Sequence, residues 1–187
     1  MSKIFVVSAP SGAGKTTVVR KVLEKFPEIT FSISATTRSR RDFEVEGVDY
    51  FFMSENEFKK KIDANEFVEW ETFYGYYYGT LKSFINSEIE KENSVLLEVD
   101  VKGAVKIKEV YANAIMIFIL PPSIEELQKR LLKRNTETED DLQKRIERAK
   151  MEIDFQDHFK YKVVNDDIER AREQVYNILK SELIKEK

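Results

Sequence analysis

A glycine-rich segment near the start of the chain carries the residue types that bind phosphate. Residues 8–17 read SAPSGAGKTT and follow an apolar run over residues 4–7. Glycines let backbone N–H groups turn inward around phosphate oxygens, Lys15 adds a positive charge, and the Thr16 hydroxyl is a suitable Mg²⁺ ligand. The helix expected here points its positive dipole end at the same anion. We therefore predict a nucleotide-phosphate site formed by Ala9, Pro10, Ser11, Gly12, Ala13, Gly14, Lys15, Thr16 and Thr17.

One position of this segment departs from the usual phosphate-binding pattern. The strict pattern has glycine at both ends of a six-residue span, and Ala9 stands at the first of these positions. A small residue there still permits a tight turn. The alternative is a glycine-rich turn that binds nothing, but the expected strand before the segment and helix after it favour the phosphate site.

Composition excludes several other chemistries. The chain has no Cys and a single His, His158, which excludes disulfides, thiol catalysis and multi-histidine metal sites. Its 187 residues with 42% hydrophobic content suit one domain with a good core. No apolar run approaches the roughly 20 residues of a membrane span, and the N-terminus lacks a cleavable signal, so a cytoplasmic location is expected.

The arginines are clustered although the net charge is only −3. Seven of the ten lie in two windows, residues 38–41 and 130–148. Guanidinium forks bind phosphate oxygens in pairs, so two such clusters suggest two further anion contacts. The balanced net charge gives no sign of a nucleic-acid or membrane surface.

Strands alternate with helices over most of the chain, which predicts a parallel α/β sheet. Apolar runs without alternation are typical of strands covered on both faces. A helix should follow the phosphate segment and stop at Pro27, and a capping box at Ser123 and Glu126 should begin another. The next helix should bury Leu142, Ile146, Ala149 and Ile153, and a terminal helix should start near Ile168. The expected strands are Ile4 to Val7, Val95 to Asp100, Ala114 to Leu120 and Tyr161 to Val164.

Residues 31–81 have a different pattern and are expected to form an inserted subdomain. Short alternating β segments surround a capped helix at Ser54 to Ile62, and an aromatic turn is expected over Phe73 to Gly79. The insertion has no proline- or glycine-rich linker, so it should move as a rigid unit on hinges near its ends.

Two acidic residues stand two apart at the end of an expected strand. Glu98 and Asp100 should therefore point to the same face at the carboxyl end of the sheet, where α/β folds bind ligands. A salt-bridged strand end is the alternative interpretation.

Several motifs, in order along the chain, closely resemble guanylate kinase. The match covers essentially the whole sequence and is far more specific than the phosphate segment alone. The motifs are SATTRSRRDFEVEGVDY (34–50), NEFVEW (65–70), YYGT (77–80), EVDVKG (98–103), RNTETE (134–139) and VVNDD (163–167).

The resemblance implies a P-loop NTPase fold, with a parallel sheet core flanked by helices, an inserted GMP-binding subdomain and a helical lid. It implies a single domain over residues 1–187. The core would take residues 1–32, 82–125 and 151–187, the GMP-binding subdomain residues 33–81 and the lid residues 126–150.

The resemblance also assigns an acceptor site for GMP. Arg38, Arg41, Tyr50 and Tyr78 would hold the acceptor phosphate, although an isolated cluster such as residues 38–41 is as often a solvated basic turn. Glu69 and Ser34 would read the donors and the acceptor of guanine, and adenine would leave Glu69 unpaired. Further base contacts are Thr80, which keeps the hydroxyl of the serine common there, and Asp100.

The lid arginines would bridge the two nucleotides. Arg130 and Arg134 are four apart, and Arg145 and Arg148 are three apart, so each pair shares a helix face. Such exposed arginines often pair only with surface acids. By resemblance, Arg130 and Arg134 contact ATP, Arg145 and Arg148 contact GMP, and Asn165 lies near the adenine. The implied catalytic residues are Lys15, Arg38, Arg130, Arg134 and Arg145.

The implied reaction is MgATP plus GMP giving ADP plus GDP, in purine nucleotide metabolism and GMP recycling. A phosphate monoester is largely dianionic at neutral pH, so no general base is needed. Mg²⁺ would be bound by Thr16, water and phosphates, with Glu98 ordering a metal-bound water. Many family members have Asp where Glu98 stands.

Two alternatives stay open from the sequence. Guanylate kinase-like domains also occur in scaffolding proteins as peptide-binding modules, but those usually lack an intact phosphate segment, which Lys15 and Thr16 complete here. The second alternative is a kinase for another small phosphate ester. Glu69 and Ser34 argue against it, because the resemblance assigns them to guanine. The sequence indicates no nucleic-acid or membrane partner and leaves the oligomeric state open.

Overall fold

A five-stranded parallel sheet forms the centre of the molecule. The computed structural model describes residues 2–73, 75–132 and 139–184, without the side chains of residues 139–142. The strand order is β2-β7-β1-β8-β9. The central strand β1 pairs in parallel with β7 and with β8. The strands are β1 (Ile4–Ser8), β2 (Ile29–Phe31), β7 (Ser94–Glu98), β8 (Ile115–Leu120) and β9 (Tyr161–Val164).

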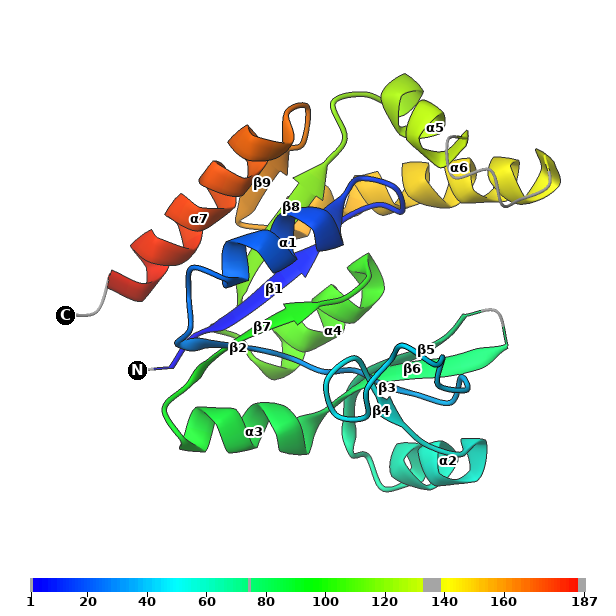
Figure 1. The fold of residues 1–187 in the computed structure, drawn as a ribbon, viewed down its shortest axis with the longest axis vertical. Coiled ribbons are helices and arrows are strands. Elements are labelled where there is room, and N and C mark those ends of the chain that lie inside the picture. Colours follow the sequence, from blue (N-terminus) through cyan, green and yellow to red (C-terminus); the bar gives the residue numbers. More distant parts are fainter. Residues whose placement is uncertain (1, 74, 133–138, 185–187) are drawn as a thin grey trace.

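Helices cover both faces of this sheet, which explains why its strands are apolar runs rather than alternating ones (Figure 1). Phe5 and Val7 of β1 pack in one core with α1 and α7, whereas Val6 packs in a second core with α3 and α4. The two faces of β1 are thus both buried. The covering helices are α1 (Lys15–Leu23), α3 (Lys82–Glu90), α4 (Val101–Val110) and α7 (Ile168–Ile184).

A second, four-stranded sheet lies beside the first, in the order β4-β3-β6-β5. Its hairpin of β5 (Phe67–Phe73) and β6 (Tyr76–Leu81) is antiparallel. The remaining elements are β3 (Ala35–Thr36), β4 (Phe51–Phe52) and α2 (Glu55–Asp63). A small core holds α2 to this sheet, with the rings of Phe58 and Phe67 stacked 4.2 Å apart. Ser54 and Glu57 form a complete capping box at the start of α2.

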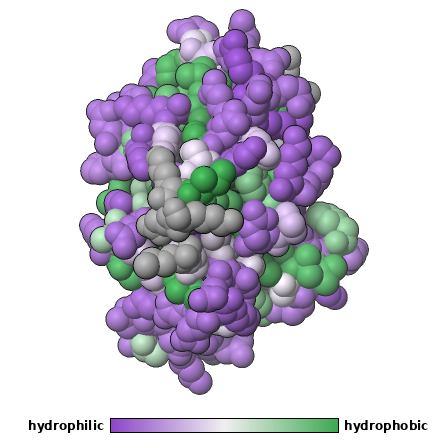
Figure 2. Space-filling view, turned by 90° about the vertical axis from the view of Figure 1, so that its left-hand side faces the viewer, coloured by the Kyte–Doolittle hydropathy of each residue, from purple (hydrophilic) through white to green (hydrophobic). Residues whose placement is uncertain are grey.

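Two further helices, α5 (Ile124–Leu132) and α6 (Glu139–Asp154), lie at the same end of the main sheet as the loop that follows β1 (Figure 1). They pack on each other through a small apolar cluster formed by Leu127, Leu131, Ile146 and Ala149. A short 3₁₀ turn over Phe155–His158 leads from α6 into β9. β1 begins and α7 ends at the opposite end of the sheet (Figure 1), and the described residues of that face are largely hydrophilic (Figure 2).

The predicted α/β fold is confirmed, with all four predicted strands of the main sheet present. Three details differ. Helices α3 and α4 were not predicted. The expected strand over residues 95–100 ends at Glu98, and Asp100 is instead the N-cap of α4, where its Oδ1 accepts the Gly103 N–H at 2.7 Å. The expectation that both acids share one strand face is therefore wrong. Most of the expected aromatic turn, from Tyr76 onward, belongs to strand β6.

Among the helices of the described ranges, none combines the length and apolar character needed to cross a membrane.

Candidate active site

The loop between β1 and α1 has a backbone that only glycine adopts without strain. Gly12 and Gly14 have φ angles of 90° and 92°. A Cβ atom on Gly14 would lie 2.4 Å from Nδ2 of Asn165, and one on Gly12 would lie 2.9 Å from Cδ2 of Leu131. Both glycines of the phosphate segment are thus required by backbone conformation and by neighbouring side chains. Gly14 is also the N-cap of α1, so the amino end of that helix faces the loop.

Asn165, at the end of β9, holds this loop from behind. Its buried carboxamide donates to the carbonyl oxygen of Ala13 at 2.7 Å. Arg130 of α5 donates from Nη2 to the backbone oxygen of Asn165 at 2.9 Å, and its Nε lies 3.3 Å from Oε1 of Glu126. The contacts with ATP that the resemblance implies for Asn165 and Arg130 stay predictions.

Lys15, the first residue of α1, reaches across to the end of β7. Its Nζ donates to the Val99 carbonyl at 2.9 Å and lies 3.9 Å from Oε1 of Glu98. Burial lowers the pKa of Lys15, while the charges of Glu98 and Asp100 act in the opposite direction. The ammonium group is therefore held beside the loop by acceptors of the protein itself.

The two carboxylate oxygens of Glu98 differ in their hydrogen bonding. The Thr16 hydroxyl donates to Oε1 of Glu98. The second oxygen, Oε2, is buried and has no hydrogen-bond partner among the described residues. Buried polar atoms normally have partners, so an unpaired carboxylate oxygen beside a phosphate loop points to a missing water or cation. The Thr16 hydroxyl and the Glu98 carboxylate together fit a Mg²⁺ ion that retains several waters and is bound mainly by phosphates.

Glu69, on β5, is a buried carboxylate with one firm partner. The Thr80 hydroxyl on the paired strand β6 donates to Oε1 of Glu69 at 2.6 Å. Burial raises the pKa of Glu69, and the hydrogen bond from Thr80 partly opposes that shift. The other oxygen, Oε2, lies against Gly103 at the start of α4, where a Cβ atom would approach it to 3.0 Å. Glu69 is therefore fixed in place by two elements.

Arg38 is held in place by an acid that the sequence analysis did not single out. Its Nη1 and Nη2 donate to the two oxygens of Glu44 at 3.0 and 2.6 Å. The hydrogen bonds from Arg38 lower the pKa of Glu44 to about 2. The guanidinium lies 5.4 Å from the ring centroid of Tyr50, which meets the ring of Tyr78 edge-on at 6.1 Å. Arg41 donates its backbone N–H to Glu44 at 2.8 Å, while its side chain is exposed.

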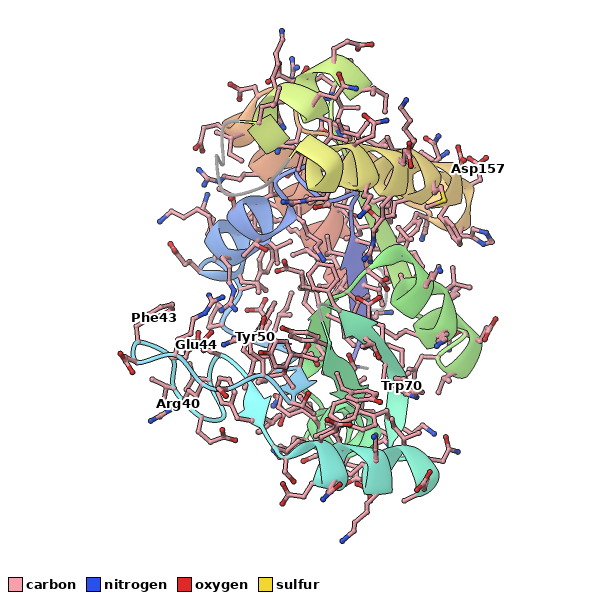
Figure 3. The ribbon with its side chains drawn as sticks, turned by 90° about the vertical axis from the view of Figure 1, so that its right-hand side faces the viewer. Arg40, Phe43, Glu44, Tyr50, Trp70 and Asp157 are labelled. Atoms are coloured by element: carbon pink, nitrogen blue, oxygen red, sulfur yellow. The ribbon has the colours of Figure 1, made fainter. Side chains whose placement is uncertain are left out.

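The loop that carries Glu44 extends away from the second sheet. Figure 3 shows Phe43 and Arg40 toward its outer end and Tyr50 closer to the main sheet. Phe43 is 77% exposed, whereas Glu44 beside it is buried. The loop therefore turns its acid inward toward Arg38.

One cavity of about 440 Å³ joins the phosphate loop to the second sheet. The predicted residues that line it come from α1, β5, β6, β7 and α6 and from the loops beside them. They are Ala9, Pro10, Ser11, Gly12, Gly14, Lys15, Thr16, Thr17, Ser34, Tyr50, Glu69, Tyr78, Glu98, Asp100, Arg145 and Arg148.

Other predicted site residues lie outside this lining. Thr80 contacts the lining residue Glu69, and Asn165 donates to the carbonyl of Ala13 within the phosphate loop. Arg38, Arg41 and Arg130 are not part of the cavity wall. Arg134 lies outside the described residues.

Sequence reasoning missed three acids at the site: Glu44, Glu71 and Glu152. Glu152, on α6, accepts the Ser11 N–H of the phosphate loop at 3.0 Å and the Nε–H of Arg148 at 2.8 Å. Arg145 of the same helix donates to the Ser11 hydroxyl at 2.9 Å. The four-residue spacing between Arg148 and Glu152 was a readable signal for one helix face. Glu71 follows Glu69 at strand spacing, which was a readable signal for the same side of β5.

Comparison with known proteins gives one family. The sequence model of the guanylate kinase family matches residues 1–182. The guanylate kinase of Thermotoga maritima is 45% identical over 183 residues, covering 98% of this chain and 88% of that protein. That of Caldanaerobacter subterraneus is 46% identical over 179 residues, covering 96% and 87%. The crystal structure of guanylate kinase from Anaplasma phagocytophilum superposes with a TM-score of 0.78 at 34% identity, covering 99% of this chain and 88% of that one. The chain is therefore an enzyme of the guanylate kinase family.

Proposed function

We propose that the chain transfers the γ-phosphoryl group of MgATP to GMP, reversibly, giving ADP and GDP. The observation that carries this proposal is one continuous cavity, which is lined at one end by the phosphate loop and at the other by Glu69 and Tyr78. A kinase with a nucleotide acceptor needs both ends open to one space, because the two phosphates must meet in line.

The donor end would hold the phosphates of ATP. The loop presents backbone N–H groups at the amino end of α1, and Lys15 stands beside it. Lys15 is a catalytic residue in this scheme because its ammonium group would neutralise charge on the transferring group. Binding of phosphate oxygens would replace the Val99 carbonyl and Glu98 as its acceptors.

The base end would select guanine by hydrogen-bond polarity. Guanine presents two N–H donors beside a carbonyl acceptor. Glu69 would accept from both donors, and the Ser34 hydroxyl would donate to the carbonyl, while the Thr80 hydroxyl donates to Glu69. The bond from Thr80 supports this assignment, since it fixes the carboxylate before any ligand arrives. Asp100 would take the remaining amino hydrogen through the oxygen that does not cap α4.

The acceptor phosphate would be bound by Arg38, Arg41, Tyr50 and Tyr78. Two guanidinium groups and two phenols suit a dianion. Bidentate pairing with Glu44 supports the assignment of Arg38, because it fixes the plane of the guanidinium group. The dianion needs no general base, so the carboxylates of the cavity are free for positioning and recognition.

Thr16 would ligate Mg²⁺, with Glu98 orienting a metal-bound water through its unpaired oxygen. Among the described residues no group of three or more His, Cys, Asp or Glu gathers as metal ligands. The ion would therefore be held chiefly by phosphates and water. When bound, it would supply charge neutralisation on the donor phosphates.

Helices α5 and α6 would act as the lid, residues 126–150, between the core and the GMP-binding subdomain, residues 33–81. The contact between Arg145 and Ser11 supports this, since it brings a lid arginine to the phosphate loop. Arg130 and Arg134 would contact ATP, and Arg145 would bridge to the acceptor. Closure would exclude water, which otherwise accepts the phosphoryl group. We assign the reaction to cytoplasmic purine nucleotide metabolism, including GMP recycling.

A coupled assay that follows ADP production tests the proposal. GMP should support rapid turnover with MgATP, and AMP should support far less under the same conditions. No ADP formation with GMP, or equal rates with GMP and AMP, would overturn it. A panel of other phosphate monoesters in the same assay identifies the acceptor in that case.

A further inference from the structure

Arg148 of α6 contacts three carboxylates that belong to different parts of the fold. Its Nη2 lies 3.6 Å from Oε2 of Glu71 on β5 and 3.5 Å from Oδ2 of Asp100 at the start of α4. Its Nε donates to Glu152 on its own helix at 2.8 Å. The guanidinium also lies over the ring of Phe73, with its Cζ 5.3 Å from the ring centroid. One side chain thus bridges the second sheet, the start of α4 and α6.

This bridge crosses the base end of the cavity. Glu69 and Glu71 stand two apart on β5, and both line the cavity together with Phe73 and Arg148. The acids next to Arg148 are therefore neighbours of the residue assigned to guanine. The pair of Arg38 and Glu44 is a separate cluster within the second sheet and its loop.

The three acids do not have the same role toward Arg148. Asp100 uses its other oxygen to cap α4, and Glu152 lies four residues along the same helix as Arg148. Neither fixes α6 to the second sheet. Glu71 alone among these three comes from the second sheet, so its contact with Arg148, together with that of Phe73, connects α6 to this sheet beside the cavity.

We propose that Glu71 is a positioning residue for the acceptor nucleotide, which holds Arg148, and with it α6, across the base end of the cavity. This role rests on the proposed function, since it takes the cavity to be the GMP site. It places Arg148 next to the nucleobase of the acceptor rather than at the acceptor phosphate. Glu71 acts through Arg148 and strengthens acceptor binding without taking part in phosphoryl transfer.

The charges around Glu71 make its contact with Arg148 dependent on pH. Asp100 at α4, Glu69 on the same strand, Arg148 on α6 and Lys15 at the phosphate loop all face it. Burial, followed by the charge of Asp100, raises the pKa of Glu71 to about 7, against the opposing charge of Arg148. Below that pH Glu71 is protonated and attracts Arg148 less. Above that pH Glu71 is ionised and attracts Arg148 most strongly.

The variant Glu71→Gln tests the proposal, because it keeps the shape of the side chain and removes its charge. Near pH 8 the KM for GMP should rise roughly two- to five-fold, as expected for one half-exposed ion pair, with the KM for ATP and kcat unchanged. The ratio of the two KM values for GMP, variant to wild type, should fall toward one near pH 6. Titration of the GMP phosphate cancels in this ratio.

Three further variants separate positioning from a general structural effect. Glu66→Gln removes an exposed ion pair with Lys61 outside the cavity and should leave both KM values unchanged. Glu71→Asp keeps the charge and should restore part of the acceptor affinity at high pH. In an Arg148→Met background, Glu71→Gln should have no further effect on the KM for GMP. Melting temperatures of all variants show whether each one is folded.

The outcomes are distinct. A wild-type protein that phosphorylates no GMP overturns the proposed function and this role with it. An active wild type whose KM for GMP is unchanged by Glu71→Gln at high pH overturns the role of Glu71 alone. Equal effects of Glu71→Gln with and without Arg148 also overturn it, because Glu71 would then not act through Arg148.

Discussion

Lys15 and Glu98 face each other across the carboxyl end of the main sheet, with Nζ of Lys15 3.9 Å from Oε1 of Glu98. The same oxygen of Glu98 accepts the hydroxyl of Thr16. The chain thus brings together the three groups to which the proposed function assigns phosphate binding (Lys15), metal binding (Thr16) and orientation of metal-bound water (Glu98). Such preorganisation is the principal means of catalysis when the chemistry requires no general base.

Replacing Lys15 by Met should lower kcat by about 10²- to 10³-fold, the usual effect of losing one group that stabilises transition-state charge. The fold should survive, because burial lowers the pKa of Lys15 and Met removes a charge that is costly to bury. Steady-state kinetics and thermal unfolding measure the two effects. Lys21→Met, on the exposed side of the same helix, is the matched control. Unchanged turnover in Lys15→Met would remove Lys15 from the mechanism.

Glu69→Gln should reduce discrimination between bases. The carboxamide presents an N–H donor where guanine also presents donors, so transition-state binding of GMP should weaken by about 1–3 kcal/mol, which lowers kcat/KM roughly 5- to 150-fold. The rate with AMP should fall less or rise. Thr80→Val should have a smaller effect in the same direction, because it removes only the bond that orients Glu69. If both variants keep the full preference for GMP over AMP, guanine is read elsewhere.

Glu44→Gln should raise the KM for GMP by about ten-fold, because Arg38 loses its bidentate, charged partner. Asp42→Asn removes the same charge from an exposed position of the same loop and should leave the KM unchanged. A KM that is equal in Glu44→Gln and wild type would show that Arg38 needs no such support.

The pairing of Glu44 with Arg38 also predicts a pH dependence of stability. The pKa of Glu44 is lowered to about 2 in the folded protein, below its usual carboxyl range. Its stabilising effect is therefore present above the unfolded pKa and is lost as pH falls toward about 2. The difference in melting temperature between wild type and Glu44→Gln should be constant from neutral pH to about pH 5 and should shrink at lower pH. A difference that grows on acidification would contradict this sign.

The sequence predicted the parts of the fold that rest on local pattern. Apolar runs located four of the five strands of the main sheet but not the short edge strand β2, and the capping box at Ser54 located α2. The prediction from local pattern failed where one residue lies between two elements. Asp100 reads as the end of an apolar strand, yet its side chain caps α4, because a short acidic side chain there satisfies the free N–H of Gly103.

The sequence predicted which residues line the site but not which residues hold them in place. Lys15, Glu69 and Arg145 were identified from motifs and line one cavity. The acids that hold cations in place, Glu44 and Glu152, were not, since an acid that pairs within a loop or a helix face has the same local pattern as one on the surface. Only the three-dimensional structure shows that Glu152 accepts the N–H of Ser11, 141 residues earlier in the chain.

Gly14→Ala should reduce both the stability of the fold and ATP binding. Comparison with Gly75→Ala separates backbone strain from displacement of a neighbouring side chain. Both glycines have a positive φ, 92° and 79°, so alanine at either position should cost about 1–2 kcal/mol in backbone strain. A Cβ atom on Gly75 meets nothing within 4 Å, whereas one on Gly14 would lie 2.4 Å from Nδ2 of Asn165. Gly14→Ala must therefore also displace Asn165, which holds the loop through the Ala13 carbonyl. Urea unfolding should show the larger loss of stability for Gly14→Ala, and calorimetry should show weaker ATP binding for that variant alone. Equal losses of stability with unchanged ATP binding would mean that the loop tolerates movement of Asn165.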